Sequence, residues 1–232
     1  MIRSTNAINP GSLFLMNPAG IVFGPNSSLD ITGSFLGTTA SSISFKNGET
    51  LASTATQLPT PLLTVSVPTG LQFGQAPASM TVRSVLGLTV KTGQTLGLVG
   101  GNLAIDGGIV RAPAGRLELG SVGTGSQVAI APVSSALSSG FGLDYATVQN
   151  FQDIQLSNLA TVDASGAGGG AIQVQGRRVE IKDGSALVSD TTEAAFGQGI
   201  TVYASENSWS AAWLPMPPRC SRMETMTQFP VE

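Results

Sequence analysis

The sequence predicts an all-β protein whose short strands stack as a parallel β-helix, each strand lying on its equivalent in the next turn of the chain. Three observations lead to this fold class. Charged residues make up 11% of the 232 residues, against about 25% in typical soluble domains. Glycine is frequent, at 29 residues, and it separates apolar stretches of only a few residues. The later part of the chain also contains a diverged repeat with a period of about 25 residues.

The most informative segment is Leu13–Phe35, LFLMNPAGIVFGPNSSLDITGSF. Two short apolar strands in it are joined by a turn whose residues indicate the turn type. Asn17 can cap the turn through its side chain, Pro18 sets φ at the first central position, and Gly20 relieves the exit, which predicts a type I turn. Strands this short bury little surface alone, so they need similar strands to pack against.

The rest of the chain continues as short strands separated by Gly, Asn, Asp or Pro. No segment has helical periodicity, apart from one short turn of helix expected at Ser135–Ser139. No two strands are joined by the two-residue turn of an antiparallel hairpin, so all strands are expected in the stack. In chain order the expected strands are Leu13–Met16, Ile21–Phe23, Leu29–Thr32, Ser42–Phe45, Leu62–Val67, Thr81–Arg83, Leu86–Val90, Thr95–Val99, Leu103–Asp106, Ile109–Arg111, Arg116–Leu119, Gln127–Ala131, Asp153–Ser157, Thr161–Ala164, Ala171–Gln175, Arg178–Lys182, Ala186–Ser189 and Ile200–Ala204.

The last strands of this series form the repeat. Each unit holds three strands in about 25 residues, which suits one turn of a parallel β-helix with strands about 4.8 Å apart. A propeller blade would need about 40 residues. The matching segments are Ile154–Leu156 with Val179–Ile181, Ala160–Asp163 with Ala186–Ser189 at a distance of 26 positions, and Gly170–Val174 with Gly199–Val202 after a small insertion.

Composition argues against several classes of function. The net charge of −3 gives no reason to expect a nucleic acid partner. The chain has no histidine and one cysteine, Cys220, so we expect no disulfide, no metal site, no cofactor and no catalytic residue. No run of about 18 apolar residues predicts a transmembrane helix. The first residues, MIRSTNAINPGS, lack the apolar region of a signal peptide.

The segment Ser12–Phe35 resembles the secretion domain at the start of filamentous haemagglutinin-type exoproteins of two-partner secretion systems. In that family the turn usually reads NPNGI, and Ala19 departs from the usual Asn. The matching turn positions are Asn17, Pro18, Gly20 and Ile21. Three further segments resemble the cyanobacterial branch of these exoproteins: PLLTVSVPTGLQFG at Pro61–Gly74, NFQDIQLS at Asn150–Ser157 and GRRVEIKDGS at Gly176–Ser185.

This resemblance implies a right-handed parallel β-helix and export by an outer-membrane transporter whose POTRA domains recognise the secretion domain. The turn Asn17–Ile21 is then expected to be the transporter-recognition site. The exported protein would be a non-catalytic adhesin or haemagglutinin at the cell surface, with a glycan or protein receptor. The expected domains are a partial secretion domain at 1–83, a continuous β-helix repeat region at 84–205 and an off-pattern tail at 206–232.

The two ends of the chain depart from the family pattern. The signal peptide and first strands of the secretion domain are not found, so the chain as written would remain cytoplasmic. The tail at 206–232 holds both tryptophans and no glycine, which predicts a frameshifted or disordered segment, or else an irregular cap on the last rung. The chain is therefore interpreted as incomplete at both ends, and its uncapped strand edges predict self-association.

Two other classes of function stay open, a β-helical polysaccharide lyase or hydrolase and a passive surface or matrix protein. A lyase or hydrolase needs carboxylates clustered on one face of the stack, whereas an aspartate at a strand end is more simply explained as a turn cap. The glycine clusters at Gly166–Gly170 and Gly97–Gly101 lack the Asp of a calcium repeat and the Lys of a phosphate loop, respectively. The charged residues considered for an enzyme are Asp153, Asp163, Asp183, Asp190, Arg177 and Arg178.

Overall fold

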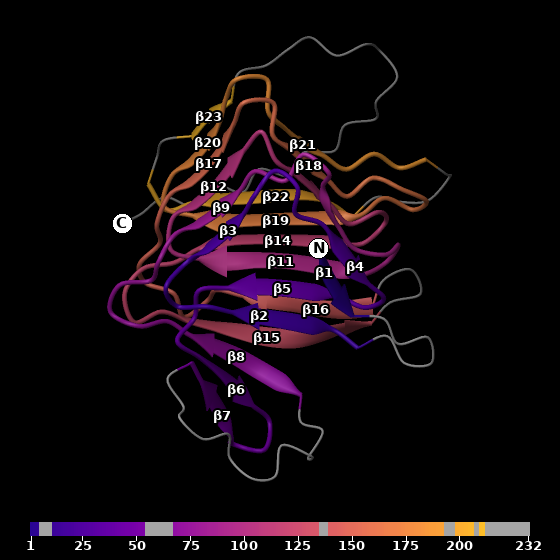
Figure 1. Cartoon of the computed structure of the whole chain (residues 1–232). Helices are drawn as coiled ribbons and strands as arrows, with labels where there is room; N and C mark the ends of the chain where they lie inside the picture. Colours follow the sequence, from indigo (N-terminus) through magenta and orange to yellow (C-terminus); the bar gives the residue numbers. More distant parts are fainter. Residues whose placement is uncertain (5–10, 54–66, 135–138, 193–197, 207–208, 212–232) are drawn as a thin grey trace.

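The computed structural model describes residues 1–4, 11–53, 67–134, 139–192, 198–206 and 209–211, and these residues form strands and turns without a helix (Figure 1). The prediction of an all-β protein is therefore confirmed. Within the described ranges there is also no helix with the length and hydropathy needed to cross a membrane.

Most strands belong to three parallel sheets. The first sheet contains β2 (Leu13–Met16), β5 (Phe35–Thr38), β11 (Thr95–Gly100), β14 (Arg116–Ser121), β19 (Ala171–Gly176) and β22 (Gly199–Ala204). The second contains β3 (Ile21–Phe23), β9 (Met80–Val82), β12 (Leu103–Asp106), β17 (Ile154–Ser157), β20 (Val179–Ile181) and β23 (Trp209–Ala211). The third contains β10 (Leu88–Thr89), β13 (Ile109–Arg111), β18 (Thr161–Asp163) and β21 (Ala186–Val188), and the parallel pair β1 (Ile2–Ser4) and β4 (Leu29–Ile31) lies against β10.

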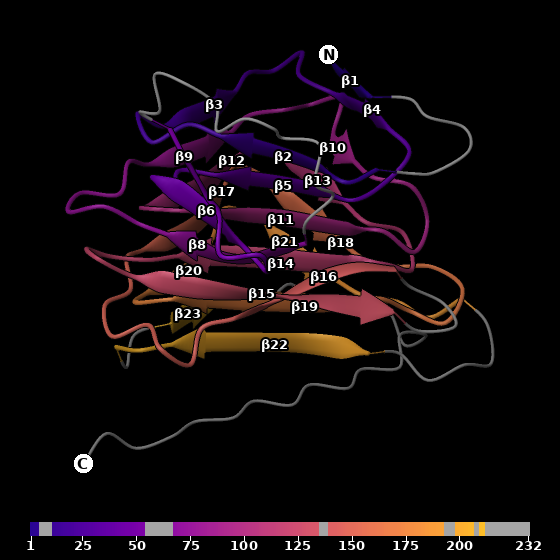
Figure 2. The ribbon, with the colours of Figure 1, turned by 90° about the horizontal axis from the view of Figure 1, so that it is seen from below.

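The chain enters the three sheets in a constant order, one strand in each, and then returns to the first sheet. We call one such pass a rung. Within each sheet the strands follow one another in sequence order, from β2 toward β22 in the first sheet (Figure 2). Every described pairing inside these sheets is parallel. The arrangement is consistent with a β-helix-like fold, as the short strands and the repeat predict.

The strand register confirms the internal repeat and corrects one of its alignments. Ile154 pairs with Val179 and Ile172 pairs with Ile200, as the sequence match requires. In the third sheet, however, Thr161 pairs with Ala186, at 25 positions and not at the expected 26. The sequence match was displaced by one residue because Ala160 and Val162 coincide with Ala186 and Val188 at a spacing of 26 positions.

A fifth group of strands corrects the expectation that all strands lie in the stack. It is an antiparallel sheet in the order β16-β15-β8-β6-β7, whose strands β8, β6 and β7 lie at the bottom of Figure 1. Its strands lie in two insertions, each placed between the first and second strands of a rung. The two-residue turn criterion missed β6–β7 because residues 46–49, a four-residue loop, join them. The strands are β6 (Ser42–Phe45), β7 (Thr50–Ala52), β8 (Pro68–Gln72), β15 (Gln127–Ser134) and β16 (Ser139–Asp144).

The expected strand positions agree well with the observed ones. Five of the expected strands are confirmed with their bounds: Leu13–Met16, Ile21–Phe23, Ser42–Phe45, Leu103–Asp106 and Ile109–Arg111. The other expected strands in the described ranges differ by one to three residues at an end. The strand Phe35–Thr38 was not expected, since Gly37 interrupts its apolar run. The expected strand at 62–66 and the helical turn at 135–138 lie outside the described residues, and Ser139 begins β16. Of the expected tail, residues 209–211 form β23, which pairs with β20.

Two apolar cores hold these layers together. The first fills the space between the three parallel sheets with the inward residues of every rung, for example Leu117 and Leu119 of β14, which are both completely buried. The second core lies between the outer face of the first sheet and the antiparallel sheet, where Leu36 and Val99 meet Phe141. Each fully buried Leu or Phe stabilises the fold by about 1.5–3 kcal/mol relative to an exposed one.

The corner between the second and third sheets contains a strained position that gives a stability prediction. Asn158 and Leu159 both have positive φ, 59° and 62°, and the rung below has Asp183 and Gly184 there, at 54° and 72°. A positive φ costs an L-residue such as leucine about 1–2 kcal/mol, and Leu159 is 72% exposed, so little burial offsets that cost. We expect Leu159→Gly to raise the free energy of unfolding by about 1 kcal/mol in a urea titration.

The matched change is Gly184→Ala in the rung below. It should lower stability by about 1 kcal/mol, because a Cβ there would keep the φ of +72° and meet the Leu159 Cδ2 atom at 2.7 Å. A lower unfolding midpoint for Leu159→Gly than for the unaltered chain would contradict the strain argument.

Candidate functional site

The turn Asn17–Ile21 connects β2 to β3 and has the geometry expected from its sequence. The Gly20 amide donates to the Asn17 carbonyl at 3.1 Å, and the Ala19 amide donates to Asn17 Oδ1 at 3.1 Å. Neither Pro18 nor Ala19 has a positive φ, which excludes a type II turn and the primed types. The prediction of a type I turn capped by the Asn17 side chain is therefore confirmed.

Backbone contacts with the next rung hold both ends of this turn. The Asn17 amide donates to Thr38 O at 3.0 Å, and the Ile21 amide donates to Ser79 O at 3.3 Å. Gly20 has a φ of +108°, and a Cβ there would lie 3.0 Å from Ser79 O, so the position requires glycine. Ile21 is buried in the core, whereas Asn17 and Ala19 are exposed. The turn thus presents a fixed apex on a rigid base, which suits recognition by another protein.

The carboxylates considered for an enzyme do not gather on one face. Asp153 pairs with Arg177 at 2.8 Å between the first and second sheets, and Arg177 also contacts Glu206 at 3.2 Å. Asp163 ends a third-sheet strand, and its Oδ1 accepts the Ser165 amide at 2.9 Å, which confirms the turn-cap interpretation. Asp183 lies in the turn between β20 and β21.

The two remaining candidates lie at strand ends as well. Asp190 follows β21, where its amide donates to Ser165 Oγ at 2.9 Å. Arg178 is 3.7 Å from Glu206 through its guanidinium group. Within the described ranges, no group of three or more His, Cys, Asp or Glu residues could hold a metal ion.

The glycine clusters have structural roles in turns and strands. Residues 95–100 form β11, so the cluster at Gly97–Gly101 is mostly extended strand and offers no phosphate loop. In the cluster Gly166–Gly170, the Gly169 amide donates to Gly166 O at 3.0 Å and closes a tight turn. Both interpretations made from the sequence agree with this geometry.

A buried ion pair, which the sequence did not single out, joins the first sheet to the antiparallel sheet. Glu118 of β14 is completely buried, and its Oε1 accepts hydrogen bonds from Arg116 Nε and, at 3.4 Å, from the Leu143 amide of β16. Arg116 Nη2 donates to Gln173 Oε1 at 2.9 Å, and Gln173 Nε2 donates to Leu143 O at 3.2 Å. These four residues therefore tie β14 and β19 to β16.

Burial dominates the electrostatics of this cluster. It raises the pKa of Glu118 from 4.5 to about 7, although the charge and the hydrogen bond of Arg116 oppose the shift. Burial also raises the pKa of Tyr145 well above its usual value, and the nearby Glu118 carboxylate adds to that effect. Glu118 Oε2 and the Tyr145 hydroxyl are buried without a hydrogen-bond partner among the described residues. The alternation Arg116-Leu117-Glu118-Leu119 shows that Glu118 faces outward, but not that an insertion covers it.

The fold and the turn define a class, namely all-β proteins of stacked parallel strands that carry an exposed, rigid turn at the first rung. Residues 6–181, more than half of the chain, match the TPS secretion domain family. The chain belongs to this family and is a two-partner-secretion exoprotein. The family resemblance stated from Ser12–Phe35 is thereby confirmed. Proteins of this family are secreted or cell-surface proteins with a partner outer-membrane transporter. No curated protein and no solved structure matches the chain.

The buried Glu118 carboxyl gives a pH prediction. Its pKa is higher in the folded protein, about 7, than the ordinary value of 4.5, so the folded state binds the proton more tightly. The stabilisation of the folded state by the protonated Glu118 is complete below pH 4.5 and is lost as the pH rises to about 7. The free energy of unfolding should fall by about 3 kcal/mol in total over this range. Urea unfolding between pH 4.5 and pH 8 should show this fall, and Glu118→Gln should flatten it.

Asp106→Asn is the control for this measurement. Hydrogen bonds from Asn158 and Arg83 lower the pKa of Asp106 below its ordinary 3.8, so its contribution is lost only at more acidic pH. The fall in stability between pH 4.5 and pH 7 should therefore persist in Asp106→Asn. The same fall in Glu118→Gln as in the unaltered chain would show that Glu118 does not titrate in this window.

Proposed function

We propose that this chain is the transporter-recognised part of a haemagglutinin-like adhesin of the cyanobacterial type, folded as a right-handed parallel β-helix. The observation that carries the proposal is the match to the TPS secretion domain over residues 6–181. The constant order in which the chain enters three parallel sheets supports the solenoid. In this proposal the fold has a structural and adhesive role and catalyses no reaction.

The turn Asn17–Ile21 is proposed as the site that the transporter's POTRA domains recognise. Its support is geometric, because the apex is exposed while Gly20 and Ile21 are held against Ser79 of the next rung. Binding of such a turn costs little conformational entropy, since the turn is already held in one conformation. Ala19 differs from the usual Asn of the family, and its exposed methyl group would weaken a polar contact at this point.

The non-catalytic role is supported by the distribution of charged groups. Asp153, Asp163 and Asp183 lie at three different corners of the rungs. Asp190 shares the corner of Asp163, where the Asp163 carboxylate is engaged as a turn cap and with Arg111, so the described carboxylates form no cluster of three. Action at the cell surface, with a glycan or protein receptor, follows the family. Self-association through the open ends of the stack stays a prediction from the sequence.

Export measurements test the recognition role of the turn. The chain is fused behind a Sec signal peptide and expressed together with a two-partner-secretion transporter. Asn17→Ala removes the side-chain oxygen that caps the turn, and we expect several-fold less protein in the medium. Ala19→Asn should increase export, because it restores the amide that the family uses at this position.

Asn26→Ala is the matched control, since Asn26 is an exposed asparagine in the next turn of the same rung, where Ser27 bonds back to Gly24. It should leave export unchanged. Equal export of the Asn17 and Asn26 variants, with equal stability in urea, would refute recognition through Asn17–Ile21. Loss of export in all variants alike would mean that the fold, and not this turn, is recognised.

A further inference from the structure

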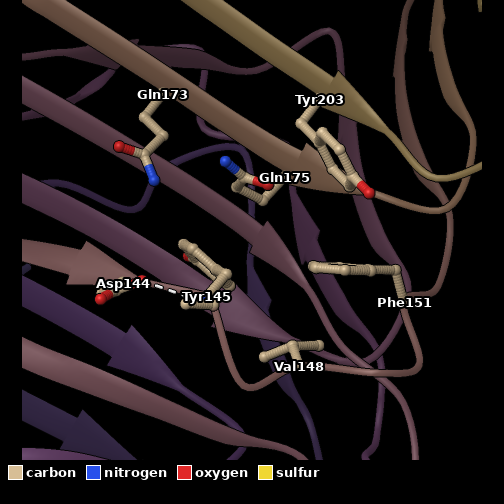
Figure 3. A pocket seen from close by; sticks show the side chains of 8 residues that line it. Asp144, Tyr145, Val148, Phe151, Gln173, Gln175 and Tyr203 are labelled. Carbon is tan, nitrogen blue, oxygen red and sulfur yellow. Dashed lines mark hydrogen bonds between the residues drawn. The ribbon is translucent and has the colours of Figure 1, made fainter. Parts of the chain in front are cut away.

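A groove of about 310 Å³ lies on the outer face of the first sheet, where the antiparallel sheet stops covering it. Gln173 and Gln175 of β19 and Tyr203 of β22 form its floor. The segment that follows β16, with Tyr145 and Phe151, forms its wall (Figure 3). The groove is far along the stack from the turn at Asn17–Ile21, because β19 and β22 belong to the last two rungs.

The pairing of β14, β19 and β22 fixes the position of the floor, and the absence of a side chain at Gly120 fixes the position of the wall. Gly120, Gln175 and Tyr203 are successive partners across β14, β19 and β22, so they form one row on the outer face. A Cβ at Gly120 would lie 2.2 Å from the Tyr145 hydroxyl oxygen, so the absence of a side chain lets Tyr145 rest directly on the sheet. The wall therefore ends at Gly120, and the next two side chains of the row, those of Gln175 and Tyr203, are left uncovered.

The groove is built before any ligand arrives. The Phe151 ring lies 6.3 Å from the Tyr145 ring and 5.7 Å from the Tyr203 ring, centroid to centroid, so aromatic contacts join the wall to the floor. The wall segment is held by the Val148 amide, which donates to Tyr145 O at 2.9 Å. Its far end is held by the Gly123 amide, which donates to Asn150 O at 2.6 Å. A preorganised site of this kind loses little entropy on binding.

The groove combines polar groups that are open to a ligand with aromatic rings. No hydrogen bond within the described part of the chain uses the side chains of Gln175 or Tyr203. A glutamine amide offers donors and an acceptor together, and a tyrosine hydroxyl offers one of each. Asp144 is the single charged residue among the eight that line the groove, and no Lys or Arg is among them. Such a lining suits a neutral ligand with many hydroxyl groups and disfavours an anionic one.

An extended peptide fits this groove less well. Peptides that add to a sheet need a strand edge with free backbone groups. The strand that supplies Gln173 and Gln175 is paired on both edges, with β14 and with β22, so its amides and carbonyls are already used. On the face where the groove lies, the floor therefore presents side chains, and of its two strands only β22 has an outer edge without a described strand partner. A sugar ring, with hydroxyls at its rim and C–H groups on its faces, matches the Gln175 amide and the Tyr203 hydroxyl beside aromatic rings.

We infer that this groove binds a neutral saccharide, with Gln175 and Tyr203 bonding the hydroxyl groups and Phe151 packing against the ring. The inference deepens the adhesive role proposed above, and it rests on that proposal for its biological meaning. Sugar binding itself does not depend on the adhesive role, because the isolated chain should bind the sugar whether or not the chain is exported.

The test uses the full chain in solution with the methyl glycosides of glucose, galactose and mannose and their neutral disaccharides. Binding is measured by saturation-transfer NMR and titration calorimetry. At least one neutral sugar should bind, and Gln175→Ala and Tyr203→Phe should each weaken it about tenfold, the loss expected when one good hydrogen bond disappears. Tyr203→Phe keeps the ring contact with Phe151, so its effect reports the hydroxyl group alone.

Gln155→Ala is the matched control, because Gln155 is a half-buried glutamine on β17 of the second sheet. It should change binding less than twofold. No binding of any neutral sugar, binding unaffected by both groove variants, or a preference for sialylated or sulfated sugars would each overturn the inference.

Adhesion of cells that display the exported protein separates this inference from the proposed function. Sugar binding that depends on Gln175, without adhesion, supports the groove as a saccharide site and refutes the adhesive role. Adhesion that is unchanged by Gln175→Ala and Tyr203→Phe supports the adhesive role and refutes the groove as the site of adhesion.

Discussion

The in-register parallel pairing of the first sheet is the constraint on which the rest of the structure depends. Successive residues of a strand face opposite sides, so a slip of one residue would exchange the two faces. In β14 such a slip would turn Glu118 into the apolar core and expose Leu117 and Leu119. The cost of burying an unpaired carboxylate far exceeds the loss of one ladder bond. Register is therefore specified most strongly where the outer face carries charge, and the hydrogen bond from Arg116 to Gln173 ties the next strand, β19, to the same register.

The outer face of that sheet is used in two ways. The two insertions leave the rungs at the same corner and build an antiparallel layer over β5, β11 and β14, so these strands are buried on both sides. The sequence of β11 accordingly reads as a nearly continuous apolar run, TLGLVG, whereas β14 places the Arg116–Glu118 pair on its covered face. Beyond Gly120 the layer ends, and the outward residues change to Gln175 and Tyr203. A single boundary thus separates a structural face, closed by Glu118, from a face that a ligand can reach.

Sequence reasoning succeeded where the physics is local. The cap of Asn17, the φ values at Pro18 and Ala19, and the role of Gly20 all follow from four adjacent residues, so the turn could be predicted in detail. The strands of the repeat could also be predicted, because their inward residues recur in register. The antiparallel layer could not be predicted, since β8 and β15 pair across more than 50 residues and neither strand has a sequence feature that identifies the other as its partner. For the same reason the sequence did not single out Glu118, and it did not predict the groove, which needs both β19 and the segment after β16.

The positions of the turn and the groove in the stack have a functional consequence. A β-helix-like stack places early residues at one end and late residues at the other, so Asn17–Ile21 belongs to the first rung and Tyr203 to the last described one (Figure 2). A transporter that holds the first rung would leave the groove free, and a sugar in the groove would not touch the turn. Among the rungs between them lies the buried junction of Arg116, Glu118 and Leu143, and the segment with Tyr145 follows Leu143 along the chain. Because the wall of the groove continues from that junction, a variant that loosens it should disturb the groove and leave the turn at Asn17–Ile21 in place.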